Sequence, residues 1–272
     1  MLIPNAVRYV GTVIGISLIG GGAIMAGFEV GGLVFAVSPF VAAVIVRAIG
    51  GDGLRGVGLG WTGKHGWYWL AIVMFPVTMA VSVGLGLLAG AVELGKDVSV
   101  ASIGAATLVA LVPRLALAIG EEFGWRGYLT PLLHANRVHP LMNHAIVGVT
   151  WVLWHVPFII ATPAYTEQPV WLFAPLFACG VMAIAFILGE TRLRTRSVWP
   201  AVYAHGIGNA LGYALLGDGV FTRIDGLWFA PRPEGIIMIV ILGFIAVAVG
   251  LIPRPATSPP VSDTFPQFLF MP

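Results

Sequence analysis

Eight long apolar segments make up most of this chain, and they constrain its fold more than any other feature. Each is close to the ~20 predominantly apolar residues that a helix needs to cross a bilayer. The segments are continuously apolar and do not alternate, which excludes a membrane β-barrel. We therefore predict an all-α fold, a polytopic membrane helix bundle of about eight transmembrane helices. The predicted spans are residues 7–28, 30–49, 67–91, 102–126, 143–162, 169–190, 198–217 and 235–252.

The composition excludes several classes of protein. Only 10% of the 272 residues are charged and 58% are hydrophobic, whereas a soluble domain carries about 25% charged residues. Too few charges remain to cover a water-facing surface, so a soluble enzyme is excluded. The basic residues fall between apolar segments and form no dense patch, so no nucleic-acid partner is expected. The single cysteine, Cys179, allows no internal disulfide.

The charges of successive loops predict an orientation. Ten Lys and Arg residues fall in loops on one side of the predicted spans and three on the other. By the positive-inside rule both termini lie in the cytoplasm. We expect a membrane domain over 1–252 and a flexible cytoplasmic tail over 253–272, in a bacterial plasma membrane. The ten residues are Arg8, Arg47, Arg55, Lys64, Arg126, Arg137, Arg192, Arg194, Arg196 and Arg254.

Two adjacent carboxylates stand out in the fourth predicted span. Ionisable residues within a membrane are costly, and each needs a functional reason. Glu122 and Arg126 are four residues apart, in the favourable order for an ion pair on one helix face. Glu121 points about 100° away and has no partner at helical spacing, which suits it to accept a proton. The alternative is a helix end at which both acids are solvated.

Two further spans contribute histidines. His155 follows Trp151 by four residues and precedes Pro157, which bends the helix beside it. His205 and Asn209 are also four residues apart and share one helix face. Taken alone, His155 could be a hydrogen-bonded residue of the core, and His205 with Asn209 could form a polar contact between helices. Together, the predicted topology places them and Glu121 at one depth in the cytoplasmic half of the bilayer.

A carboxylate, two imidazoles and an amide suit the hydrolysis of an amide by water. Glu121 would take a proton from water that His155 orients, and His205 and Asn209 would donate hydrogen bonds to the oxyanion. The cofactor stays open. Glu121, His155 and His205 form a complete catalytic zinc set with one position left for water, although HExxH is absent. The metal-free interpretation is favoured, because an amide is a poor zinc ligand.

The motifs resemble those of the CPBP family, also called the type II CAAX prenyl protease, Abi or lysostaphin-resistance-protein-A-like family. The matching residues are Glu121-Glu122 with Arg126, Trp151 with His155, and His205 with Asn209; Trp151 stands where the family usually has phenylalanine. The resemblance implies an intramembrane endopeptidase whose site opens to the cytosol. Its partners would be membrane lipids and a hydrophobic peptide or lipid-modified protein. Glu121 and His155 would activate water, Glu122 and Arg126 would form a supporting ion pair, and His205 and Asn209 would form the oxyanion hole. Family members are described both as metallopeptidases and as metal-free glutamate peptidases.

Two other classes of function remain. A proton-coupled transporter would use the buried Glu and His residues as a relay, but the chain lacks clear internal repeats and its polar residues cluster on one side. A bacteriocin-immunity or membrane scaffold protein without catalysis would tolerate changes at Glu121, which an endopeptidase would not.

Overall fold

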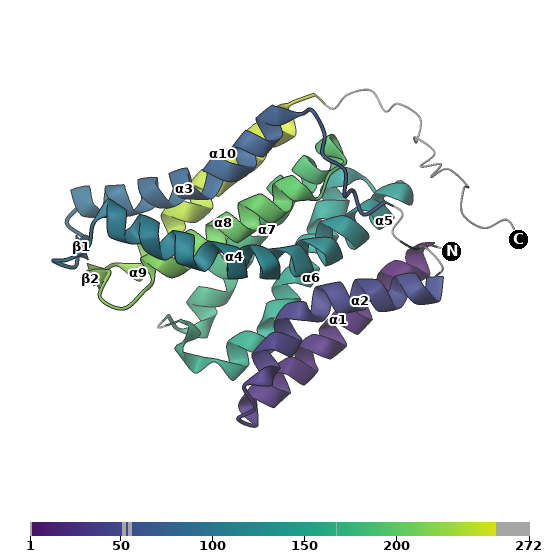
Figure 1. The fold of residues 1–272 in the computed structure, drawn as a ribbon, viewed down its shortest axis with the longest axis horizontal. Helices are drawn as coiled ribbons and strands as arrows, with labels where there is room; N and C mark the ends of the chain where they lie inside the picture. Colours follow the sequence, from purple (N-terminus) through teal and green to yellow (C-terminus); the bar gives the residue numbers. More distant parts are fainter. Residues whose placement is uncertain (1, 51–52, 54–55, 167, 254–272) are drawn as a thin grey trace, which may run out of the picture.

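The computed structural model describes residues 2–50, 53, 56–166 and 168–253. All eight apolar segments form helices, which confirms the prediction of a polytopic all-α bundle (Figure 1). The expected tail beyond Pro253, including Arg254, and the loop residue Arg55 lie outside the described residues. The eight helices are α1 (Leu2–Met25), α2 (Val30–Gly50), α3 (His65–Leu88), α4 (Val100–Gly124), α6 (Pro140–Ala161), α7 (Val170–Thr195), α8 (Trp199–Leu215) and α10 (Ile236–Leu251).

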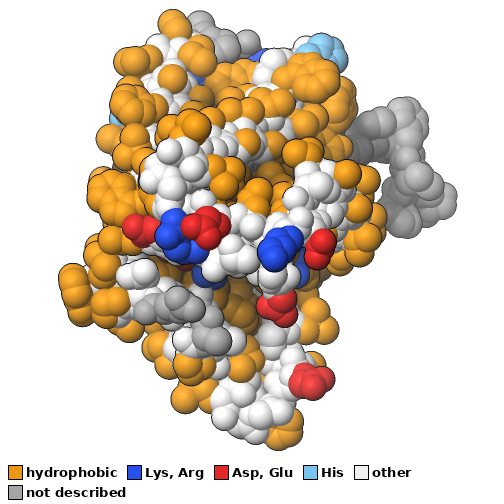
Figure 2. Space-filling model, turned by 90° about the vertical axis from the view of Figure 1, so that its left-hand side faces the viewer, with side chains coloured by type: hydrophobic (Ala, Val, Ile, Leu, Met, Phe, Trp, Pro, Cys, Tyr) orange, Lys and Arg blue, Asp and Glu red, His pale blue; other side chains and the backbone are white. Residues whose placement is uncertain are grey.

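Six of the described helical segments are long and apolar enough to cross a membrane. The other two expected spans, α8 and α10, have 17 and 16 residues. They are therefore about 25 Å long at 1.5 Å per residue, slightly less than the ~30 Å hydrocarbon core. The outer surface is apolar: Leu108, Val109 and Val112 on α4 are 70%, 81% and 74% exposed. Hydrophobic side chains also cover most of the face in Figure 2, where the charged ones gather in a band across the middle. Such a surface is suited to contact with lipid.

Short elements that the sequence did not predict join two loops at one end of the bundle. Strand β1 (Val92–Leu94), after α3, pairs antiparallel with β2 (Phe221–Ile224), after α8. The one-turn helix α9 (Gly226–Phe229) follows β2, and the Asp225 side chain accepts hydrogen bonds from its first backbone amides. The strand pair therefore links the connection that precedes α4 to the connection that follows α8 (Figure 1, left).

Helix α4 is held between α2 and α8 by close contacts at glycines. A Cβ atom on Gly124 would lie 2.6 Å from the backbone oxygen of Pro39 on α2. A Cβ atom on Gly206 of α8 would lie 2.6 Å from the Leu115 side chain on α4. Only glycine allows helices to approach this closely. These two contacts therefore fix the rotation of α4 about its axis, and with it the direction of the Glu121 side chain.

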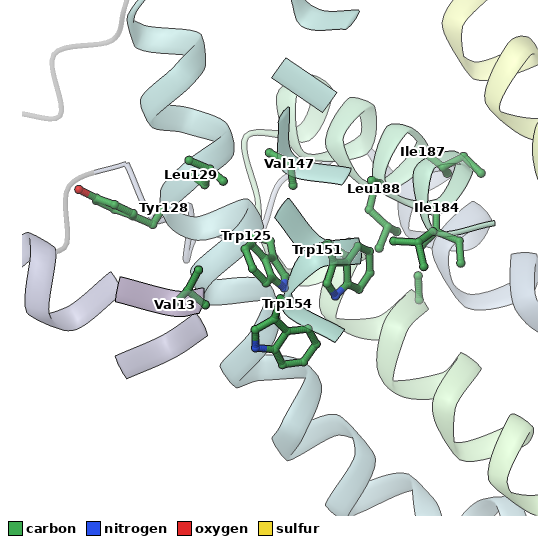
Figure 3. Packing of buried hydrophobic residues seen from close by; sticks show 14 of the residues in the cluster. Val13, Trp125, Tyr128, Leu129, Val147, Trp151, Trp154, Ile184, Ile187 and Leu188 are labelled. Carbon is green, nitrogen blue, oxygen red and sulfur yellow. The ribbon is translucent and has the colours of Figure 1, made fainter. Parts of the chain in front are cut away.

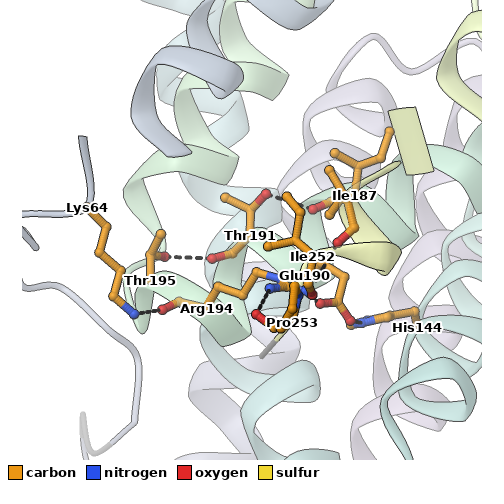
Figure 4. A network of polar contacts seen from close by, with 10 residues as sticks. Lys64, His144, Ile187, Glu190, Thr191, Arg194, Thr195, Ile252 and Pro253 are labelled. Atoms are coloured by element: carbon orange, nitrogen blue, oxygen red, sulfur yellow. Dashed lines mark hydrogen bonds and ion pairs between the residues drawn. The ribbon is translucent and has the colours of Figure 1, made fainter. Parts of the chain in front are cut away.

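Helix α7 is longer than predicted. The expected span ended at residue 190, with Arg192 and Arg194 in a loop, but the helix continues to Thr195 and both arginines are buried. Their burial is compensated by polar partners. Arg194 Nε and His144 Nε2 on α6 each lie 2.9 Å from the carboxylate of buried Glu190, and Arg194 Nη2 donates to two carbonyls at the end of α10 (Figure 4). This network joins α6, α7 and α10.

The orientation predicts accessibility to protease. A tag on either terminus should be protected in intact cells, because both termini are expected in the cytoplasm. A protease site inserted at the exposed turn residue Gly219, beside β2, should be cut from outside. The same site inserted at exposed Gly63, between α2 and α3, is the matched control and should resist cleavage. Cleavage at Gly63 with protection at Gly219 would reverse the orientation.

Candidate active site

The two adjacent glutamates lie inside a helix and not at its end. Helix α4 continues through a π-helix, η1 (Trp125–Leu129), into α5 (Thr130–Ala135), so that the helical segment runs for 36 residues. Glu122 is fully buried and Glu121 is 8% exposed. The alternative of a solvated helix end is therefore wrong: these acids lie in the interior of the bundle.

The π-helix directly after the glutamates is fixed by two arginines. A π-helix displaces its carbonyl groups from the α-helical pattern and is common at functional sites. Arg47 at the end of α2 donates from Nη2 to the Gly127 carbonyl at 2.9 Å. Arg192 on α7 donates from Nε to the Arg126 carbonyl at 2.8 Å. These contacts satisfy carbonyls that are buried away from water and hold the segment from two sides.

Glu122 connects α4 to α8. Its carboxylate lies 2.9 Å from Arg126 Nη1 and 2.8 Å from His205 Nδ1. Since a carboxylate only accepts, Nδ1 of His205 donates this hydrogen bond. The opposite ring nitrogen, Nε2, then faces Glu121, with Oε1 at 3.8 Å. Glu122 thus fixes the orientation of the imidazole that faces the second carboxylate.

Trp151 and its neighbours form an aromatic wall beside these groups. The Arg126 guanidinium lies 4.5 Å from the centroid of the Trp151 indole, and the His205 ring lies 5.4 Å from it. Trp125 and Trp154 pack near Trp151 in the same buried cluster (Figure 3). Aromatic packing of this kind excludes water from one side of the ionic group.

His155 lies one turn beyond Trp151, at the edge of the cluster. Its Nδ1 is 2.8 Å from the Trp151 carbonyl oxygen. Because a carbonyl only accepts, Nδ1 carries the proton, and Nε2 of the neutral ring is an acceptor. His155 interacts electrostatically with His205. Within the described residues no direct contact joins His155 to Glu121.

Asn209 lies one turn after His205 on α8 and is partly exposed. Its side chain makes no hydrogen bond among the described residues. The structure therefore brings Glu121, Glu122, Arg126 and His205 into one group. His155 and Asn209 lie beside that group. His155 is one helical turn from Trp151 of the aromatic wall, and Asn209 is one turn from His205.

The residues of the possible zinc set do not come together as metal ligands. Nδ1 of each histidine donates a hydrogen bond within the protein, from His205 to Glu122 and from His155 to the Trp151 carbonyl, and this leaves Nε2 of each ring available to a ligand. No three His, Cys, Asp or Glu side chains in the described part of the chain are arranged to hold a metal ion. We therefore derive no step that passes through a metal.

Some members of the site have no signal in the sequence. The contact between Glu122 and His205 joins residues 83 positions apart, and no local spacing predicts it. The role of Arg47 and Arg192 in holding η1 is likewise a long-range effect. Trp151 was predicted only as part of a motif, and its contact with Arg126 adds a physical reason for an aromatic ring there.

The fold and the site together define an integral, multi-pass membrane protein with a buried carboxylate–imidazole cluster. Residues 103–211 match the family model described as Type II CAAX prenyl endopeptidase Rce1-like, so the chain is similar to that family over this part. The resemblance predicted from the motifs is thereby confirmed, and the matched segment contains every predicted site residue from Glu121 to Asn209. No curated protein matches the chain.

Proposed function

We propose that the chain is an intramembrane endopeptidase that hydrolyses a peptide bond in a hydrophobic or membrane-anchored peptide. The observation that carries this proposal is the buried pair of Glu121 and His205, 3.8 Å apart, with His205 oriented by Glu122. The pair lies in a segment that matches prenyl endopeptidases, which favours a lipid-modified substrate. We further propose a bacterial plasma membrane, with both termini and the site toward the cytoplasm.

The proposed reaction uses water as the nucleophile. Glu121 accepts a proton from water while the water oxygen forms a bond to the peptide carbonyl carbon. His155, through the acceptor Nε2, orients that water. The carbonyl oxygen becomes an oxyanion that accepts hydrogen bonds from the Asn209 amide and from Nε2 of a protonated His205. The C–N bond then breaks, and the proton held by Glu121 passes to the leaving nitrogen.

A peptide library tests this proposal. The purified protein is incubated with hydrophobic peptides, with and without a farnesylated cysteine, and the products are identified by mass spectrometry. We expect internal cleavage of at least one peptide. Parallel reactions with a chelator, and metal analysis of the active protein, decide the cofactor: tightly bound zinc that is needed for turnover would contradict the assignment of His205 to the oxyanion hole. Two results together would favour a scaffold or immunity protein: no peptide is cleaved, and changes at Glu121 leave the function of the protein in cells unaffected.

Replacing Asn209 with alanine should lower kcat by roughly 10²–10³-fold, the usual cost of one lost oxyanion donor. KM should change little, because the hydrogen bond strengthens only in the transition state. Steady-state kinetics on the cleaved peptide measure both constants. A rise in KM with unchanged kcat would instead assign Asn209 to ground-state binding.

A further inference from the structure

Trp151 on α6 contacts three other members of the candidate site. The centroid of its indole ring lies 4.5 Å from the guanidinium carbon of Arg126 and 5.4 Å from the centroid of the His205 ring. Its backbone carbonyl accepts the hydrogen bond from His155 Nδ1 at 2.8 Å. Trp151 is only 5% exposed, so these contacts are made in the interior of the bundle.

The indole N–H group of Trp151 lies beside a fourth member of the site, Glu121. Nε1 is buried and forms no complete hydrogen bond with any described residue, and the acceptor with which it interacts is the Glu121 carboxylate. An indole N–H only donates and an ionised carboxylate only accepts. Leaving a buried donor without an acceptor is costly, and hydrogen bonds in active sites often tighten only when the substrate is bound. The two groups are therefore matched as donor and acceptor.

The proposed reaction requires a donor to Glu121 that is independent of the other site residues. His205 Nε2 lies 3.8 Å from Glu121 Oε1, but the proposed reaction uses the same nitrogen to bind the oxyanion. Arg126 Nη1 is held by both carboxylate oxygens of Glu122, at 2.9 and 3.1 Å. The indole N–H of Trp151 has neither of these tasks, and it remains a donor at every stage of the proton transfer.

Helix α6 is fixed close to Trp151. Three residues later, Trp154 Nε1 donates to Ser38 Oγ on α2 at 2.6 Å, and the Trp154 carbonyl accepts from Ser17 Oγ on α1 at 2.7 Å. Both indoles belong to the buried aromatic cluster (Figure 3). A side chain on a helix that is fixed in this way is placed more precisely than one on a loop, so Trp151 is suited to hold a neighbour in position.

We propose that the indole N–H of Trp151 donates a hydrogen bond to the Glu121 carboxylate and holds this base in position for water while His205 binds the oxyanion. Trp151 is then a positioning residue, which acts through Glu121 and not on the reacting atoms. The proposal rests on the peptidase function proposed above. Removing the N–H group should lower kcat and leave KM unchanged, because the contacts with bound substrate are not altered.

Two replacements remove the N–H group and keep an aromatic ring. Trp151→Phe has a smaller ring, whereas benzothienylalanine, introduced at position 151 by codon suppression, keeps the shape of the indole with sulfur in place of N–H. Both should lower kcat on a cleaved peptide by roughly 10-fold, the scale of a hydrogen bond to a charged group. The matched control is Trp199→Phe, which removes an indole N–H that donates to the Leu59 carbonyl at 2.6 Å and should keep wild-type kcat. Wild-type kcat with benzothienylalanine overturns the proposal, even if Trp151→Phe is slow.

NMR of the indole groups tests the contact without turnover, and so separates failure of this proposal from failure of the peptidase function. The protein has nine tryptophans, and the N–H signals of Trp151 and Trp125 are identified as those lost in Trp151→Phe and Trp125→Phe. In Glu121→Gln the Trp151 proton should move upfield, because a neutral amide oxygen is a weaker acceptor than a carboxylate. The proton of Trp125, whose ring lies 6.4 Å from that of Trp151, should stay in place. This result supports the hydrogen bond even if no peptide is cleaved, whereas an unmoved Trp151 signal, or equal shifts of both signals, overturns it.

Discussion

Replacing Glu121 with glutamine is expected to lower kcat/KM by about 10²–10⁴-fold, the usual cost of losing a general base. The substitution keeps the size and shape of the side chain but removes the group that accepts a proton from water. Glu121 lies 3.8 Å from His205 and also interacts with Trp151, and glutamine can keep polar contacts at both positions, so insertion and folding should be preserved. Kinetics on a cleaved peptide and thermal unfolding of the same preparation measure the two effects separately.

The matched control is Glu29→Gln, which neutralises an exposed carboxylate between α1 and α2 and should leave turnover unchanged. Wild-type turnover by Glu121→Gln would remove Glu121 from the reaction. A loss of turnover that only accompanies loss of the folded protein would assign Glu121 a structural role.

Glu122→Gln should instead destabilise the fold, by about 3–5 kcal/mol. The fully buried Glu122 carboxylate contacts Arg126 at 2.9 Å and His205 at 2.8 Å. Glutamine leaves the buried Arg126 charge without its counter-ion, and the cost of an uncompensated buried charge exceeds that of a lost hydrogen bond. Chemical unfolding in detergent micelles, followed by tryptophan fluorescence, measures the change.

The control for this prediction is Glu93→Gln. Its carboxylate pairs with Arg223 at 3.0 Å, but the Glu93 side chain is 57% exposed, and exposed pairs contribute about 0–1 kcal/mol. Equal stability of the two variants would mean that the buried Glu122 carboxylate, with its contacts to Arg126 and His205, does not stabilise the fold. Activity that falls in Glu122→Gln at full stability would assign Glu122 a direct catalytic role.

The helices of the membrane domain could be predicted from the sequence because each is a continuous apolar segment of characteristic length. The ends were less predictable, since hydropathy assigns charged residues to loops. Arg192 and Arg194 stay within α7 because Glu190 and carbonyls from other segments compensate their charges. The 36-residue segment from α4 to α5 runs past Arg126 for the same reason.

The candidate site was predictable where its residues are neighbours on one helix. The Glu122–Arg126 pair and the shared face of His205 and Asn209 follow from four-residue spacing. The hydrogen bond from His205 to Glu122 depends on how α8 docks on α4, which is set by contacts such as Leu115 with Gly206. No periodicity within either segment contains that information, and the π-helix between the glutamates and α5 has no reliable sequence signature.

Hydrolysis in ¹⁸O-labelled water tests the central claim most directly. The purified protein in lipid nanodiscs is incubated with the peptide library in labelled water, in parallel with Glu121→Gln, and the products are weighed by mass spectrometry. The wild type should release peptides whose new C-terminal carboxyl group carries ¹⁸O, and Glu121→Gln should release at most about one-hundredth as much. The absence of labelled product from every peptide, or equal amounts from the two proteins, would contradict a peptidase that activates water through Glu121.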